Sequence, residues 1–171
     1  YALRLFQKNI RGYRKMKKAV IYVHGKGGSA EEVGHYKALF PDYEIIGFDY
    51  KSQTPWEAKK EFPDYFAEKK KSFEIIILIA NSIGALFSIY SLDRTLVDRA
   101  YFISPIVNME DLILRMMQQA KVTETELEEK GEIKADFSET LSWRYLCYVR
   151  EHPISFNVPT YILYGERDNL T

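Results

Sequence analysis

The sequence has little cysteine and no long apolar run. Its 171 residues include one cysteine, Cys147, which excludes an internal disulfide and fits a reducing compartment. No apolar stretch reaches the length of a membrane span, and no signal peptide is recognisable. The sequence therefore predicts a protein without a membrane span, with the cytoplasm as its default location.

An excess of charge of either sign is also lacking. Lys and Arg together number 24, and Asp and Glu together number 24, so the formal charges cancel. This balance does not favour a nucleic-acid partner, which would be attracted by a strong positive field. The length and a hydrophobic content of 46% fit one domain over residues 1–171 with a substantial core. The composition does not indicate an oligomeric state.

Short apolar runs alternate with helical segments along the chain. Strands are predicted near residues 19–23, 44–49, 74–80, 99–104 and 159–164. This alternation is typical of an α/β protein with a parallel sheet. The helix that opens at Thr54 should be kinked or divided by Pro63. Residues 104–158 show no obvious strand, and helices are predicted there over residues 108–120, 123–130 and 137–150.

The strand predicted at residues 74–80 leads into a serine flanked by small residues. Its run of isoleucine and leucine lacks polar alternation, which suits a parallel strand buried on both faces. Ser82 follows where the strand turns into the next helix, with Gly84 and Ala85 behind it. Small residues are needed there because strand and helix backbones approach closely. The segment is therefore interpreted as a nucleophile elbow, with an incidental serine as the alternative.

A second apolar strand, near residues 19–23, ends in a glycine-rich loop. Gly25, Gly27 and Gly28 would let the backbone approach a substrate, and Ser29 with Glu32 forms a capping box for the next helix. Such a loop can also bind phosphate, but its spacing matches neither G-x-G-x-x-G nor the P-loop pattern. Nucleotide binding is therefore the weaker interpretation.

The last predicted strand is followed by a turn that carries acidic residues. Asp168 lies three residues after Gly165, and Glu166 is the nearest alternative acid. A carboxylate at this place would orient a histidine and stabilise its imidazolium form. A solvated acid in a surface turn is the simpler alternative.

These three segments resemble the α/β-hydrolase superfamily, from about Lys18 to the last residue. The elbow pattern of that superfamily is G-x-S-x-G, and Ala80 stands here in place of the first glycine. The resemblance implies the α/β-hydrolase fold, with a mostly parallel sheet, helices on both faces and a helical cap over about residues 106–157. It further implies a catalytic Ser82, a catalytic acid at Asp168, and an oxyanion hole formed by the backbone N–H groups of Lys26 and Ile83.

The triad of this superfamily also contains a histidine that follows the acid. His24, His35 and His152 all precede Asp168, and the histidine of the family's HG motif, here His24, has a structural role. We therefore expect the catalytic histidine beyond residue 171. The fold would then be truncated before its last strand and helix.

The sequence thus predicts a serine hydrolase that cleaves carboxylic esters or related small acyl substrates through an acyl-enzyme on Ser82. A serine, its base and an oxyanion hole suffice for this chemistry, so no metal and no organic cofactor is expected. One alternative is a thioesterase or peptidase with the same triad. Another is a non-catalytic binding protein on a hydrolase scaffold, since a fold does not fix a function.

The predicted cap contains an apolar stripe at helical spacing. The residues of this stripe are Met109, Leu112, Ile113, Met116 and Met117. Such stripes are more often core packing than a pocket wall. If part of the stripe faces the site, its flexible methionines would suit an acyl chain.

Overall fold

A parallel sheet of five strands forms the centre of the structure. The computed structural model describes residues 16–135, 139–166 and 168, and the strand order in the sheet is β2-β1-β3-β4-β7. The strands are β1 (Lys18–Val23), β2 (Glu44–Phe48), β3 (Ile75–Asn81), β4 (Arg99–Ile103) and β7 (Thr160–Leu163), all paired in parallel. All five strands and the parallel sheet predicted from the sequence are confirmed.

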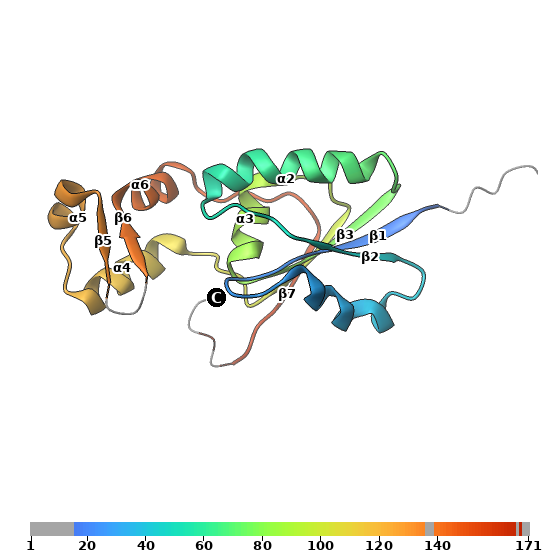
Figure 1. Cartoon of the computed structure of the whole chain (residues 1–171), viewed down its shortest axis with the longest axis horizontal. Helices are drawn as coiled ribbons and strands as arrows, with labels where there is room; N and C mark the ends of the chain where they lie inside the picture. The colour runs from blue at the N-terminus through green and yellow to red at the C-terminus, as the bar shows by residue number, and fades with distance from the viewer. Residues whose placement is uncertain (1–15, 136–138, 167, 169–171) are drawn as a thin grey trace, which may run out of the picture.

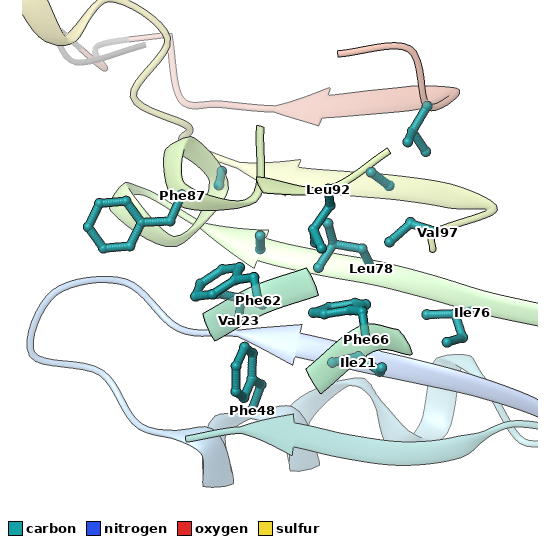
Figure 2. Packing of buried hydrophobic residues seen from close by; sticks show 14 of the residues in the cluster. Ile21, Val23, Phe48, Phe62, Phe66, Ile76, Leu78, Phe87, Leu92 and Val97 are labelled. Atoms are coloured by element: carbon teal, nitrogen blue, oxygen red, sulfur yellow. The ribbon is translucent and has the colours of Figure 1, made fainter. Parts of the chain in front are cut away.

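Helices cover both faces of this sheet (Figure 1). Helices α2 (Pro55–Lys70) and α3 (Ile83–Ser91) pack on one face, and the 3₁₀ segment η1 (Ala30–Leu39) packs on the other. Figure 2 shows Phe62 and Phe66 of α2 among the side chains of β1 and its neighbours. Both phenylalanines are fully buried, so α2 is anchored on the sheet by large apolar side chains.

Helix α2 is continuous through its proline. Pro63 lies inside the helix, and Thr54 caps the start by accepting a hydrogen bond from the Glu57 backbone N–H. Of the two predicted effects of Pro63, the division of the helix is therefore wrong, whereas the kink stays a prediction. Tertiary packing outweighs the lost backbone hydrogen bond, because Phe62 and Phe66 are buried on either side of the proline.

On the opposite face, η1 lies directly against β2. A Cβ atom built on Gly47 would lie 2.0 Å from the backbone oxygen of Ala30. Only glycine therefore fits at this crossing of strand and 3₁₀ segment. The Glu32 carboxylate accepts a hydrogen bond from the Ser29 backbone N–H, as the predicted capping box requires.

The segment between β4 and β7 builds a second group of elements beside the sheet (Figure 1). It contains α4 (Met109–Ala120), α5 (Glu124–Lys130), β5 (Glu132–Lys134), β6 (Thr140–Ser142) and α6 (Trp143–Glu151). These elements enclose a core of their own, in which Leu127, Leu141 and Leu146 are almost fully buried. We call this segment the cap. The single domain with a cap insertion over about 106–157 remains a prediction.

The cap differs from its prediction between α5 and α6. Strands β5 and β6 form a small antiparallel hairpin where no strand was expected, and α6 begins at Trp143. Residues 137 and 138, in the first part of the predicted helix, lie outside the described residues. Strands of three residues are too short to show alternation in a sequence. Gly131, which has a positive φ of 72°, ends α5 just before the hairpin.

Strand β7 forms one edge of the described sheet, and its side chains are largely exposed. Tyr161 is 59% exposed and Leu163 is 68% exposed, although both belong to an apolar strand. Tyr161 stacks on Tyr101 of the neighbouring strand, with ring centroids 5.3 Å apart. One edge of β7 is therefore hydrogen-bonded to β4, while much of the apolar side-chain surface of β7 is exposed to solvent.

Candidate active site

Ser82 occupies a strained turn between β3 and α3. Its backbone has φ of 50° and ψ of −119°, a conformation that a residue with a side chain rarely adopts. Such strain costs on the order of 1–3 kcal/mol and persists only where the surroundings enforce it. Here the Ser82 N–H donates to the Ile103 carbonyl over 3.0 Å, which ties the turn to the end of β4.

The small residues around Ser82 have a steric cause. A Cβ atom on Gly84 would lie 2.3 Å from the carbonyl oxygen of His24, so α3 crosses the end of β1 in close contact. Ala85 is fully buried directly behind it. This close approach brings the loop after β1 and the turn at Ser82 to the same place.

The Ser82 side chain borders a large cavity between the sheet and the cap. The cavity has a volume of about 1010 Å³, at the upper end of what ligand pockets occupy. Within the described ranges, the Ser82 hydroxyl makes no hydrogen bond with the protein. A hydroxyl in this position is available to a molecule in the cavity.

The glycine loop lies beside the same hydroxyl. A Cβ atom on Gly25 would be 3.2 Å from the Ser82 Cβ, and the loop is closed by a hydrogen bond of 3.1 Å from the Gly28 N–H to the Gly25 carbonyl. Lys26 and Ile83 line the cavity together with Ser82. No group in the described part of the chain accepts a hydrogen bond from either backbone N–H.

Asp168 lies at the same edge of the sheet as Ser82 but not on the cavity wall. Because β7 runs parallel to β4 and β4 to β3, the segments that follow these strands emerge together. The Asp168 N–H donates to the Gly165 carbonyl over 2.9 Å, and the residue is half-buried. Asp168 is not among the described residues that border the cavity, whereas Ser82, Ile83 and Lys26 are.

None of the three histidines has a hydrogen bond to the Ser82 hydroxyl within the described residues, although His24 borders the same cavity. The Nδ1 atom of His24 lies 2.8 Å from the Gly25 carbonyl oxygen, and its ring stacks on Tyr50. The Nδ1 atom of His152 lies 2.8 Å from the carbonyl oxygen of Tyr148, at the end of α6. His35 belongs to η1, which packs on the opposite face of the sheet from α3. The structural role expected for His24 fits its contacts, because the ring braces the loop.

Two tyrosines fix the strands that carry the loop. The Tyr50 hydroxyl donates to the His24 carbonyl over 2.9 Å, and burial raises the pKa of Tyr50 to about 12, with a further contribution from Glu61. The Tyr22 hydroxyl donates to the Glu32 carboxylate over 2.6 Å. This bond lowers the pKa of Glu32, while burial is the main reason that the pKa of Tyr22 is raised. Both hydroxyls stay protonated and act as fixed donors.

Contacts between the cap and the sheet domain were missed by the sequence analysis. Lys26 forms an ion pair with Glu139, which lies just before β6. Trp56, at the start of α2, stacks under the Arg144 guanidinium at 4.4 Å and lies edge-on to Tyr145 at 5.6 Å. Residues that are so far apart in the chain leave no periodic pattern in the sequence when they contact one another.

The apolar stripe of the cap proves to serve two purposes. Met109, Leu112, Ile113 and Met116 border the cavity, whereas Met117 is buried in the core of the cap. The stripe therefore both packs in the cap and borders the cavity, since Met109 and Ile113 belong to the core and to the cavity wall. That its methionines accommodate an acyl chain stays a prediction.

The described residues offer no ready metal site and no membrane helix. Within residues 16–135, 139–166 and 168, no three His, Cys, Asp or Glu side chains gather closely enough to bind a metal ion. Among the helices of the same part, none combines the length and the apolar character that a membrane crossing requires.

Comparison with known proteins adds information on the fold. No model of a known protein family matches the sequence, and no curated protein sequence is significantly similar to it. The structure, however, is similar to that of alpha/beta hydrolase domain-containing protein 10 from mouse. The two share 17% sequence identity with a TM-score of 0.62, over 94% of this chain and 72% of the mouse chain.

Two microbial proteins give similar results. Est1E from Butyrivibrio proteoclasticus has a TM-score of 0.63 at 14% identity, over 92% of this chain and 70% of its own. An esterase from Pyrococcus furiosus has a TM-score of 0.56 at 23% identity, over 92% of this chain and 64% of its own. At these low sequence identities, the similarity shows a shared fold. The chain has the α/β-hydrolase fold.

Proposed function

We propose that this chain carries the catalytic centre of a serine hydrolase that cleaves carboxylic esters or related acyl substrates. The observation that carries the proposal is the strained turn at Ser82, whose unbonded hydroxyl faces a cavity of about 1010 Å³. Backbone strain is kept where it serves a function, and here it projects the hydroxyl from the sheet edge. The structural neighbour from Pyrococcus furiosus, which is named as an esterase, supports the same class of reaction.

In the proposed reaction, the Ser82 oxygen attacks the acyl carbon and expels the alcohol, which leaves an acyl-enzyme that water then hydrolyses. Negative charge develops on the carbonyl oxygen during each attack. The backbone N–H groups of Lys26 and Ile83 are proposed to stabilise it, because both border the cavity and neither is used by the described protein.

Asp168 is proposed as the acid that orients the general base. Its place after β7 puts it at the edge of the sheet from which Ser82 projects. For the base we propose a histidine outside residues 1–171, since His24 and His152 are held by Gly25 and Tyr148 and His35 lies on the opposite face of the sheet. A thioesterase or peptidase would use the same groups, so the leaving group is part of the proposal to be tested.

The proposal is tested by covalent labelling of the full-length protein with a fluorophosphonate probe. We expect Ser82→Ala to abolish labelling and to lower the turnover of p-nitrophenyl butyrate by at least about a thousandfold, as the loss of a nucleophile does. The fold should persist because alanine fits the crowded turn. Ser29→Ala is the control, since its exposed hydroxyl contacts Glu31 and lies outside the cavity.

Two results would contradict this proposal. Substantial esterase activity in Ser82→Ala would place the nucleophile elsewhere. A folded wild-type protein that neither reacts with the probe nor hydrolyses esters, thioesters or amides would instead indicate a binding protein on the same scaffold.

A further inference from the structure

Helix α4 of the cap borders the large cavity beside Ser82, and the chain enters this helix from a residue that contacts Ser82. The Ile106 N–H lies 3.5 Å from the Ser82 carbonyl oxygen, and α4 begins three residues later at Met109. A helix advances about 1.5 Å per residue, so each turn of α4 lies roughly 5 Å further along the axis. Figure 1 shows α4 leading away from the sheet towards α5, so later turns of α4 lie further from the sheet edge that carries Ser82.

One face of α4 borders the cavity. The residues on that face are Met109, Leu112, Ile113 and Met116, at the spacing of a helical stripe. All four are uncharged and apolar, and the next residue to border the cavity is Gln119, which is exposed. The apolar wall therefore extends over about 10 Å, from Met109 to Met116, before it meets a polar residue at its far end.

The side chains of α4 differ in exposure, and Ile113 both borders the cavity and packs into the core of the cap. Ile113 is 7% exposed and Met117 is 3% exposed, because both pack into the cap. Leu112 and Met116 are only half-buried, and both border the cavity. Their remaining apolar surface can be covered by a ligand, which is favourable because it removes that surface from water.

Apolar side chains from other elements border the cavity as well. Leu141 of β6 and Tyr145 of α6 border it from the cap, and Ile83 and Phe87 border it from α3. The charged Lys26 at the Ser82 end is paired with Glu139. The wall that α4 contributes is therefore apolar, although the polar Glu132, Thr140, Ser142 and Arg144 of the cap also border the cavity. We call the part of the cavity along this wall the α4 slot, and it can take a hydrocarbon chain.

We propose that the α4 slot binds an unbranched acyl chain of medium length, about that of an octanoyl group, and that Leu112 and Met116 set its length. This inference rests on the proposed function, since it takes Ser82 as the point of attachment. The acyl carbon would lie at Ser82, and successive methylenes would pass Met109, Leu112 and Met116. Beyond Met116 the chain reaches exposed Gln119 and gains no further apolar cover.

The test uses p-nitrophenyl esters of acetate, butyrate, hexanoate, octanoate and dodecanoate. In the wild-type protein, kcat/KM should rise about fourfold per added methylene up to octanoate, which is the effect of burying one methylene, and then level off. In Met116→Trp, the ratio of kcat/KM for octanoate to that for butyrate should fall at least about tenfold. In Leu112→Trp, one turn nearer to Ser82, the ratio for hexanoate to butyrate should fall as well.

Two further variants control for folding and for position. Gln118→Trp adds the same bulk at an exposed position of α4 that does not border the cavity, and it should retain the wild-type profile. Met116→Ala removes bulk and should shift the optimum towards dodecanoate. If Met116→Trp and the wild-type protein have the same ratio, or if all esters slow in parallel, the proposed slot is wrong.

A binding measurement separates this inference from the proposed function. Octanoate should bind to the Ser82→Ala protein in calorimetry, and addition of Met116→Trp should weaken binding at least about tenfold, without any turnover being required. If the wild-type protein hydrolyses no ester but octanoate binds in this way, the slot stands and the catalytic proposal fails. If octanoate does not bind, or binds equally to both proteins, the slot is overturned.

Discussion

At the scale of single residues, two glycines of this protein have opposite surroundings. Gly47 lies where β2 crosses η1, so a methyl group there would meet the backbone oxygen of Ala30 at 2.0 Å. Gly34, within η1 itself, has no atom within 4 Å of a built Cβ. The same change of glycine to alanine should therefore have opposite effects on stability at Gly47 of β2 and at Gly34 of η1, the element that packs against β2.

We expect Gly47→Ala to lower the free energy of unfolding by about 3 kcal/mol or more, because backbone must move to relieve the contact. Gly34→Ala should leave it unchanged or raise it by up to about 1 kcal/mol, since alanine restricts the unfolded chain. Urea denaturation measures both. Equal stability of Gly47→Ala and the wild-type protein would show that η1 does not lie on β2 as described.

At the scale of elements, Tyr50 links the end of β2 to the loop after β1 through its hydrogen bond to the His24 carbonyl. Burial raises its pKa to about 12 in the folded state, whereas an unfolded tyrosine ionises near pH 10. A raised pKa gives stability that is complete below about pH 10 and is lost as the pH rises towards 12. The stability that Tyr50 contributes is therefore lost at alkaline pH, between about pH 10 and about pH 12.

Tyr50→Phe should therefore lose less stability than the wild-type protein between about pH 8 and about pH 11. At neutral pH the variant should be less stable by about 1 kcal/mol, because its hydrogen bond to His24 is absent. Urea denaturation at both pH values checks this, with Tyr164→Phe as a control for the loss of an exposed hydroxyl. A variant as sensitive to alkali as the wild-type protein would refute the role of Tyr50.

The elements also show what a sequence can reveal. Strand β3 was predictable because burial on both faces demands an unbroken apolar run, and the turn at Ser82 was predictable because close backbones demand Gly84. The β5–β6 hairpin was not, because three residues carry no period. The helical period predicted that the apolar stripe lies on one face of α4. It could not predict that this face borders the cavity, because the rest of the cavity wall comes from segments distant in the chain.

At the scale of the whole molecule, the sheet domain and the cap have separate apolar cores that meet at α3. Phe87 belongs to the core of the sheet, Leu86 belongs to the core of the cap, and Ile83 packs against both. The helix that follows the candidate nucleophile is therefore held from two sides. Such bracing fits the strain at Ser82, because a strained turn needs rigid surroundings.

The exposed strand β7 has a consequence for how this chain behaves in solution. Tyr161, Ile162, Leu163 and Tyr164 are between 50% and 68% exposed along one edge of the sheet. An apolar edge strand is a template for pairing with other chains, and charged side chains oppose this. Residues 1–171 expressed alone should therefore self-associate, and Ile162→Lys with Leu163→Glu should reduce the oligomeric fraction several-fold in light scattering. Leu39→Lys, at an exposed leucine of η1, should leave the oligomeric fraction unchanged. If Leu39→Lys lowers the oligomeric fraction as much as the β7 changes do, association does not depend on β7.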